Sequence, residues 1–129
     1  MDETSVSVVI PTWNSKELVV QCLESIFAAT TDLSLEVILV VNGSQDGTQV
    51  TVQNRFPQVR LIDNRYNLGF TRATNMGIQR AKGRHILLLN DDTIVVRGAL
   101  EEMVRYLDEH LDVGAIGPQL IGKDGAKQH

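Results

Sequence analysis

Two adjacent carboxylates, Asp91 and Asp92, follow the apolar run His85–Leu89 after one residue, Asn90. If that run is a strand, both side chains stand at the mouth of a sheet, where their charges repel one another. A hard divalent cation with oxygen ligands would relieve this repulsion, and Mg²⁺ favours one or two carboxylates with waters and substrate phosphates around it. The pair therefore predicts a metal site at Asp92 and Asp91. The alternative is that one carboxylate caps a turn while the other is solvated.

Polar residues also follow two earlier apolar runs, so three loops share this character. They are Pro11–Asn14 (Pro-Thr-Trp-Asn), Asn42–Thr48 (Asn-Gly-Ser-Gln-Asp-Gly-Thr) and Asn90–Thr93. A purely structural turn between a strand and a helix needs only a capping residue and a glycine. In parallel α/β sheets, ligands bind outside the carboxyl ends of the strands, where such loops meet. The three loops therefore predict one ligand site.

The elements that must position these loops alternate along the chain between short β-branched runs and stretches of helical period. This alternation predicts an α/β fold, a Rossmann-like and mainly parallel sheet flanked by helices. Each expected strand is apolar nearly throughout, as are strands that are buried on both faces. The five expected strands are Val6–Ile10, Leu35–Val41, Val59–Ile62, His85–Leu89 and Val113–Ile116.

A first helix is expected between the first two strands, with Ser15 or Asn14 as its N-cap. Its apolar residues recur at three- and four-residue intervals, which places them on one face. They are Leu18, Val19, Cys22, Leu23, Ile26 and Phe27.

Three further helices are expected. One runs from about Thr48 to Arg55 and stops before Pro57, and the next runs from about Thr71 to Lys82, with Gly83 as its left-handed C-terminal cap. The last begins near Gly98 and directs an apolar face inward.

The composition is that of one globular domain, because 43% of the 129 residues are hydrophobic and 22% are charged. Disorder, collagen and coiled coil are excluded. The net charge of −4 repels polyanions, so no nucleic-acid partner is expected. Cys22 has no second cysteine to pair with and is expected in the core. The acidic N-terminus and the short longest apolar run, Val37–Val41, predict a cytoplasmic protein with at most peripheral membrane contact.

Several familiar sites are absent from the sequence. There is no G-x-G-x-x-G after the first strand, no phosphate-binding P-loop and no H-E-x-x-H. Ser44 lacks the first glycine of G-x-S-x-G. A calcium loop would use Asn42, Ser44 and Asp46, but its twelfth position is Gln53 where a bidentate glutamate is required.

Four segments in order carry a resemblance to a known family. They are Val6–Asn14, Val41–Thr48, the N-x-G-F-x-x-A-x-N run that begins at Asn67, and Leu89–Thr93. On these motifs the chain resembles the N-terminal, nucleotide-sugar-binding half of a family 2 glycosyltransferase with the GT-A fold. The N-x-G-F run and Gly117–Leu120 are most similar to the branch that contains bacterial rhamnosyltransferases.

The resemblance implies roles for particular residues. Thr12 and Asn14 would line the nucleoside pocket, Asn42 stands where the family has a base-contacting Asp or Asn, and Asp92 would hold Mg²⁺ or Mn²⁺ and the diphosphate or ribose, with Asp91 beside it. The other implied donor-binding residues are Pro11, Trp13, Ser44, Asp46, Asn67, Gly69, Arg72, Asn75 and Asn90.

Several of these residues also allow a structural interpretation. Arg72 is expected to contact the diphosphate and is alternatively a solvated helix residue. Asn67 and Asn75 either bind the donor or only hold the loop and helix, and Gly69 either lies at the donor or only permits a tight turn. Trp13 either stacks on a base or plugs the loop.

Two positions depart from the family pattern. Val41 stands where Asp is common, which leaves the nucleobase open, and Asn90 replaces the first Asp of a D-x-D pattern.

The implied reaction is inverting transfer of a sugar from a UDP- or dTDP-sugar to a hydroxyl of a glycan or lipid-linked acceptor, in cell-surface polysaccharide synthesis at the inner face of the membrane. In the family the general base lies in an acceptor-binding half. The residues after Gly117, with a turn expected at Gly122–Gly125, are too few to supply that half. We therefore expect donor binding without transfer.

The alternatives are a non-catalytic nucleotide-binding fragment and a nucleotidyltransferase, which should have a glycine-rich basic loop where Pro11–Ser15 stands.

Overall fold

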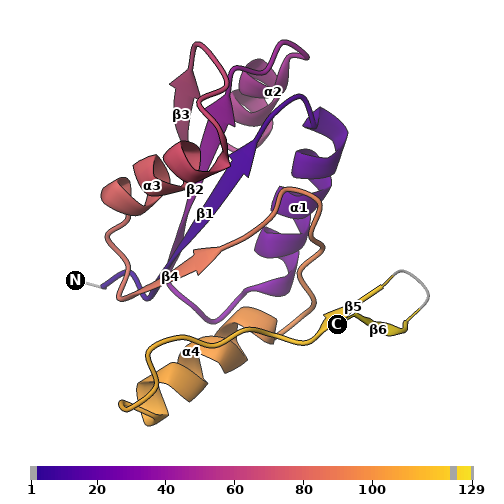
Figure 1. Ribbon diagram of the computed structural model, residues 1–129. Helices are drawn as coiled ribbons and strands as arrows, with labels where there is room; N and C mark the ends of the chain where they lie inside the picture. Colours follow the sequence, from indigo (N-terminus) through magenta and orange to yellow (C-terminus); the bar gives the residue numbers. More distant parts are fainter. Residues whose placement is uncertain (1–2, 123–124, 129) are drawn as a thin grey trace.

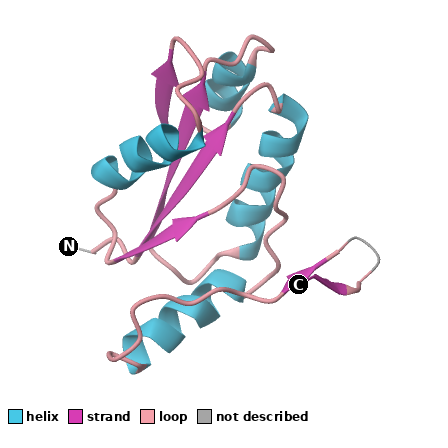
Figure 2. Cartoon of the chain, in the orientation of Figure 1, coloured by secondary structure: helices cyan, strands magenta, loops and turns pink. Residues whose placement is uncertain are grey.

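The computed structural model describes residues 3–122 and 125–128, and its centre is a four-stranded sheet (Figures 1 and 2). The strands lie in the order β3-β2-β1-β4, and every neighbouring pair is parallel. Their bounds are Val6–Thr12 for β1, Leu35–Asn42 for β2, Arg60–Asn64 for β3 and His85–Leu88 for β4. The predicted α/β architecture is confirmed, and all four carboxyl ends point to one edge of the sheet.

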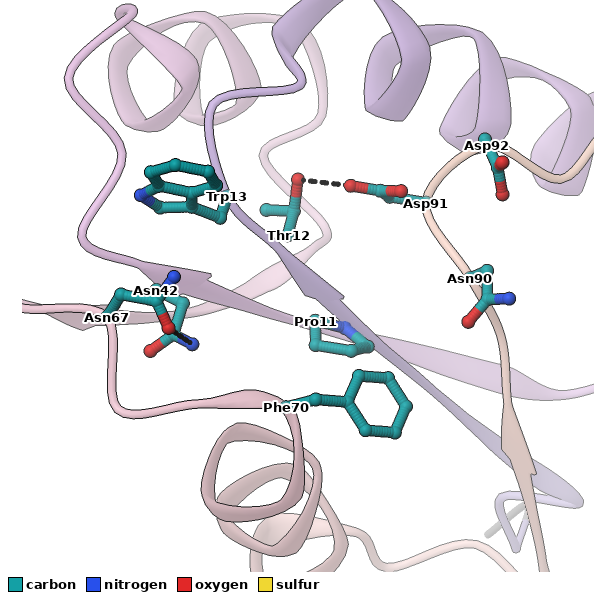
Figure 3. Close-up of a pocket in the computed structure, with 9 residues that line it drawn as sticks. All are labelled: Pro11, Thr12, Trp13, Asn42, Asn67, Phe70, Asn90, Asp91 and Asp92. Atoms are coloured by element: carbon teal, nitrogen blue, oxygen red, sulfur yellow. Dashed lines mark hydrogen bonds between the residues drawn. The ribbon is translucent and has the colours of Figure 1, made fainter.

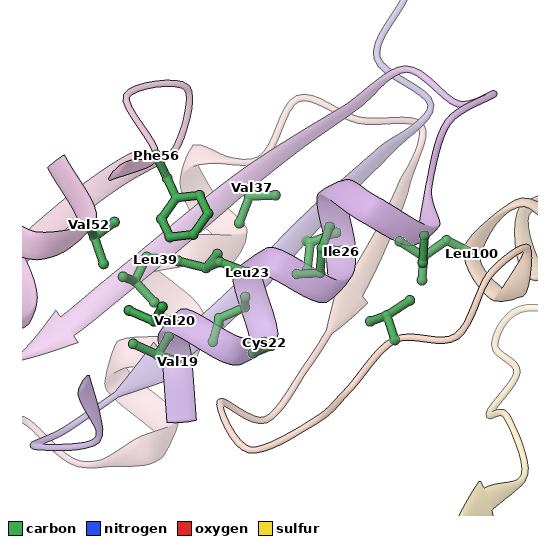
Figure 4. Close-up of a cluster of buried hydrophobic side chains, with 14 of the residues drawn as sticks. Val19, Val20, Cys22, Leu23, Ile26, Val37, Leu39, Val52, Phe56 and Leu100 are labelled. Carbon is green, nitrogen blue, oxygen red and sulfur yellow. The ribbon is translucent and has the colours of Figure 1, made fainter. Parts of the chain in front are cut away.

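Helices cover both faces of the sheet. On one face, α1 (Lys16–Ala29) and α2 (Thr48–Arg55) pack on the strands, and α4 (Ala99–Glu109) extends the same apolar cluster (Figure 4). On the other face lies α3 (Phe70–Arg80). Successive residues of β2 therefore enter different clusters: Leu39 packs with α1, whereas Ile38 and Val40 pack with Ala73 of α3. This two-sided burial explains why β2 is apolar at nearly every position.

The fourth strand differs from the prediction that every strand is buried on both faces. Ile86 and Leu88 are 45% and 53% exposed, because α3 spans β1 and β2 and leaves β4 uncovered on that face. The predicted fifth strand, Val113–Ile116, is wrong, since this segment pairs with no strand in the described residues. With Gly114 and Ala115 at its centre, the run has too few large apolar side chains to hold a strand at a sheet edge.

Near the end of the chain, two strands of two residues each, β5 (Leu120–Ile121) and β6 (Lys127–Gln128), form an antiparallel pair. Lys123 and Asp124, at the centre of the turn predicted here, lie outside the described residues. The N–H of Gly125 donates to the carbonyl of Gly122. Within residues 3–122 and 125–128, no helix has the length and apolar character that crossing a membrane requires.

The helix predictions hold with corrections at the ends. The predicted second helix has the bounds of α2, and Cys22 is fully buried in α1, as expected. Leu18 is 47% exposed and does not belong to the buried face of α1. The third helix ends at Arg80, so Gly83 is not its cap; it packs against the backbone of β1 instead.

A buried polar contact joins the first three strands at the end away from the loops. Ser7 is fully buried and donates to Glu36 Oε2 at 2.5 Å, and the same oxygen accepts the N–H of Lys82 at 2.7 Å. Arg60 donates to Glu36 Oε1 at 3.1 Å. Burial acts to raise the pKa of Glu36, but the hydrogen bonds from Ser7, Lys82 and Arg60 outweigh it and lower the pKa below the ordinary value.

This lowered pKa predicts acid sensitivity. The stabilisation by ionised Glu36 is complete above the pKa of the unfolded chain and is lost as the pH falls through the lowered pKa of the folded chain. Glu36→Gln is therefore expected to destabilise the protein at neutral pH and to flatten the decline of its melting temperature in acid. Thermal unfolding across the acid range measures this, with Glu109→Gln at an exposed position of α4 as the control. If the melting temperatures of the wild type and of Glu36→Gln fall in parallel as the pH is lowered, ionised Glu36 does not cause the acid sensitivity.

Candidate functional site

A cavity of about 390 Å³ lies at the carboxyl edge of the sheet (Figure 3). It is bounded by the loops after β1, β2 and β4 and by the start of α3, as the three polar loops predict. Asn42 and Asn67 lie on one side, and Asp91 and Asp92 lie on the other, with β1 between them. The nine lining residues are Pro11, Thr12, Trp13, Asn42, Asn67, Phe70, Asn90, Asp91 and Asp92.

The two neighbouring carboxylates have different surroundings. Thr12 is 3% exposed, and its hydroxyl donates to Asp91 Oδ2 at 2.9 Å, which ties the loop after β4 to the end of β1. Asp92 is exposed and has no hydrogen bond or ion pair within the described residues. Apart from the Thr12 hydroxyl, no group in the described residues donates to either carboxylate, so neither one caps the turn. Asp91 is thus held in place, while both oxygens of Asp92 are available to a ligand.

Helix α1 supports this loop from behind. The Sγ of Cys22 lies 3.8 Å from the carbonyl oxygen of Asn90, and Ser25 accepts the N–H of Val95 at 2.9 Å. Burial, followed by the charge of Asp91, raises the pKa of Cys22 to about 12. The thiol is therefore protonated at neutral pH and has a packing role, as the sequence predicts.

The lining residues fit a divalent cation that is shared with an anionic ligand. Asp91 and Asp92 supply two carboxylates, and no group of three or more His, Cys, Asp or Glu side chains in the described residues could hold an ion alone. None of the nine described residues that line the cavity is Lys, Arg or His. Mg²⁺ and Mn²⁺ are commonly held by one or two carboxylates, with phosphate oxygens and water completing the shell.

Three predicted site residues join the loops after β1 and β2 and do not line the cavity. Asn14, at a φ of 49°, donates its N–H to Ser44 Oγ at 2.9 Å and accepts the N–H of Gln45 at 2.7 Å. Asp46 accepts the N–H of Lys16 at 3.0 Å. Asn14, Ser44 and Asp46 thus hold the two loops together, and the donor contacts predicted for them stay a prediction.

Asp46 also takes over the capping role predicted for Ser15 or Asn14. Ser15 occupies the N-cap position of α1 without a side-chain capping bond, and the carboxylate of Asp46 receives the first N–H of the helix. Burial acts to raise the pKa of Asp46, but hydrogen bonds from Thr48 and Lys16 outweigh it and lower the pKa.

We expect Asp46→Ala to lower the free energy of unfolding by about 1–2 kcal/mol, because it removes a cap of α1 and a contact that closes the loop before α2. Denaturant unfolding measures the loss. Asp112→Ala, at an exposed aspartate in the turn after α4, is the matched control. Equal stability of the two variants would contradict the capping role.

The start of α3 is fixed by a close approach to the loop after β2. Asn42 is 4% exposed, and its Oδ1 accepts the N–H of Leu68 at 2.9 Å. Gly43 has a φ of +84°, and a Cβ there would lie 2.8 Å from the N atom of Asn67. Only glycine fits at this point of contact.

Arg72 and Asn75, which were predicted to bind the donor, do not line the cavity. The buried residues of α3 are Ala73, Thr74 and Gly77, whereas Arg72 and Asn75 are exposed. Arg72 has no hydrogen bond or ion pair in the described part of the chain. Arg72 lies two positions after Phe70, which lines the cavity, and residues two positions apart on a helix face different ways. Its predicted contact with the diphosphate stays a prediction.

Gly69 and Phe70 mark the point where the loop becomes α3. Gly69 has a φ of +87° and serves the turn, as its structural interpretation predicts. Phe70 lines the cavity and is 62% exposed, although the sequence analysis did not select it. The available signal was an aromatic residue at the first turn of a helix that starts from a polar loop. Phe70 and Trp13, which is 53% exposed, offer two rings to a ligand.

The family model described as Glycosyl transferase family 2 matches residues 7–128 of the chain. Glycosyltransferase GlyG of Streptococcus pneumoniae is 33% identical over 107 residues, which are 81% of this chain and 35% of GlyG. Minor teichoic acid biosynthesis protein GgaB of Bacillus subtilis is 29% identical over 117 residues, which are 85% of this chain and 13% of GgaB. The chain thus spans about a third or less of these relatives.

Two solved structures share the fold. The mannosyltransferase PcManGT of Pyrobaculum calidifontis, in complex with GDP-Man and Mn²⁺, is 26% identical, with a TM-score of 0.72 over 83% of this chain and 33% of PcManGT. TarS of S. aureus, residues 1–349 in complex with UDP-GlcNAc, is 20% identical, with a TM-score of 0.74 over 93% of this chain and 39% of that chain. The likeness to TarS shows the GT-A fold alone.

Proposed function

Because this chain belongs to glycosyl transferase family 2, we propose that its cavity binds the nucleoside diphosphate of a nucleotide-sugar donor within a longer glycosyltransferase. The observation that carries the proposal is the charge of the lining, which has two carboxylates and no cationic side chain. A diphosphate beside Asp91 and Asp92 requires a divalent cation between the negative groups. The Mn²⁺ and GDP-Man in the complex of PcManGT support this arrangement.

The two sides of the cavity suit the two parts of such a donor. The nucleoside would lie between the loops after β1 and β2, where Trp13 and Phe70 offer rings and Asn42 and Asn67 border the cavity. The diphosphate would lie at the loop after β4, where Asp92 is free and Thr12 orients Asp91. A divalent cation bound there supplies Lewis-acid stabilisation of the charge on the departing diphosphate. Asp92 and Asp91 would hold that cation and so set where the diphosphate lies.

We further propose inverting transfer to a hydroxyl of a glycan or lipid-linked acceptor at the cytoplasmic face of the membrane. The name of GgaB, a teichoic acid biosynthesis protein, supports a cell-surface polysaccharide. Inverting transfer needs a general base near the acceptor hydroxyl. Among the described residues that line the cavity, the proposed metal ligands are the only carboxylates, so we assign the base to the part of the longer relatives that this chain does not match. This chain then binds the donor without transferring the sugar.

Calorimetric titration with UDP, dTDP and GDP, each with Mn²⁺, with Mg²⁺ and with a chelator, tests the proposal. We expect binding with a divalent cation and at least about tenfold weaker binding without it, since the carboxylates then repel the diphosphate. Equal affinity with and without cation would refute the proposed arrangement, and no binding of any nucleotide would refute donor binding by this chain. Hydrolysis of a bound nucleotide sugar would separate a catalytic site from a purely binding fragment.

A further inference from the structure

Asn42 uses its whole hydrogen-bonding capacity on the protein. Its Nδ2 donates to Asn67 Oδ1 at 2.8 Å and to the carbonyl of Gly69 at 3.3 Å. Its Oδ1 accepts the N–H of Leu68 at 2.9 Å and Nδ2 of Asn64 at 3.3 Å. An amide has two donor hydrogens and two acceptor positions on its oxygen. All four are occupied, so this side chain has no donor or acceptor left for a ligand.

Asn64, at the end of β3, adds a bond to the Asn42 amide, whose orientation is already set by the backbone N–H of Leu68 and the backbone carbonyl of Gly69. The two residues are register partners of the parallel strands β2 and β3, and Asn64 is 9% exposed. The Nδ2 of Asn64 also lies 3.5 Å from the sulfur of Met76 in α3. If the Asn42 amide were flipped, its NH₂ would face the N–H of Leu68 and Nδ2 of Asn64, and its oxygen would face two acceptors. Only one orientation is therefore compatible with its surroundings.

The orientation of the Asn42 amide in turn fixes the side chain of Asn67, which lines the cavity. Its Oδ1 accepts both Nδ2 of Asn42 and the N–H of Gly69 at 2.9 Å, while its own Nδ2 donates to no described residue. Asn67 is exposed and lines the cavity beside Asn42 (Figure 3). With the oxygen held at two points, the NH₂ group has a fixed position at the cavity wall.

We propose that Asn42 and Asn64 are positioning residues that act through Asn67, which presents one fixed hydrogen-bond donor to the nucleoside. This inference rests on the proposed donor site. It assigns Asn42 to the support of the segment 67–69 in place of a base contact. The ligand feature that it selects is an acceptor atom, such as a carbonyl oxygen of the base, on the side of the cavity opposite Asp92.

A double-mutant cycle tests whether Asn42 affects nucleotide binding through Asn67. The variants are Asn42→Ala, Asn67→Ala and the pair, titrated with the nucleoside diphosphate among UDP, dTDP and GDP that the wild type binds with Mn²⁺. Trp13, the only tryptophan of the sequence, lines the cavity and serves as the fluorescent reporter. Each single change should weaken binding about 3- to 10-fold, as expected for one hydrogen bond. In the Asn67→Ala background, Asn42→Ala should add less than about twofold.

Asn64→Ala is the milder variant, because it leaves three of the four bonds of Asn42, and Asn54→Ala at an exposed asparagine of α2 is the matched control. Hydrogen exchange without ligand supplies a second readout. The amides of Leu68 and Gly69 should exchange faster in Asn42→Ala and Asn64→Ala and not in Asn54→Ala.

The outcomes separate the two proposals. If the wild type binds no nucleotide, the proposed donor site is refuted and this inference falls with it. If the wild type binds but the effects of Asn42→Ala and Asn67→Ala add, Asn42 contacts the nucleotide directly and only this inference is overturned. Unchanged exchange at Leu68 and Gly69 in Asn42→Ala would also overturn it.

Discussion

Asp92→Ala is expected to abolish cation-dependent nucleotide binding, with a loss of affinity of about 100-fold or more. Asp92 is the one carboxylate of the cavity without a protein partner in the described residues, so both of its oxygens can coordinate a cation. Removing it leaves Asp91 alone, and one of its oxygens already accepts the hydroxyl of Thr12. Calorimetric titration with Mn²⁺ measures the loss.

Two further variants show whether Asp92→Ala weakens binding because it removes a metal ligand or only because it removes a negative charge. Asp112→Ala makes the same change at an exposed position away from the cavity and should bind as the wild type does. Thr12→Val keeps both carboxylates but frees Asp91, so we expect an intermediate loss of about 3- to 10-fold. Cation-dependent binding by Asp92→Ala at the affinity of the wild type would overturn the assignment of this loop to the metal.

The sequence was sufficient to predict the frame of the fold, because the signals for it are local. Apolar runs such as Leu35–Val41 identify strands that are buried on both faces, and the spacing in α1 identifies its buried face. The missed features depend on which elements meet in space. The open face of β4 at Ile86 and Leu88 follows from where α3 lies, and the absence of a strand at Val113–Ile116 follows from the absence of a neighbour. Neither can be recognised from the segment itself.

The same distinction applies to the site. Three polar loops at one edge were predictable, since the carboxyl ends of parallel strands meet there. Which side chains of those loops enter the cavity depends on backbone angles and partners. Asn14, at a positive φ, turns toward Ser44, and Arg72 lies on the exposed side of α3. Asn64 went unnoticed because its role arises only from its register with Asn42.

Gly83→Ala is expected to lower the free energy of unfolding by about 1–3 kcal/mol, the range for forcing an atom into a filled space. A Cβ at this position would lie 2.6 Å from the N atom of Ser7 and 2.8 Å from the carbonyl carbon of Val6. These are backbone atoms of β1, which pairs with β2 on one side and β4 on the other. They cannot move without shifting the centre of the sheet. Denaturant unfolding measures the loss.

Gly114→Ala is the matched control, because its Cβ would meet nothing within 4 Å and its φ is not positive. It should be neutral or slightly stabilising.

The cause of the loss at Gly83 can also be tested, because the N–H of Gly83 donates to Ser7 Oγ, and that oxygen donates to Glu36. A clash that pushes residue 83 away from Ser7 weakens this chain of hydrogen bonds. Gly83→Ala and Glu36→Gln should then cost less together than the sum of their separate losses. Full additivity would place the cost in the sheet backbone alone, and a stable Gly83→Ala would show that β1 and the turn before β4 can separate freely.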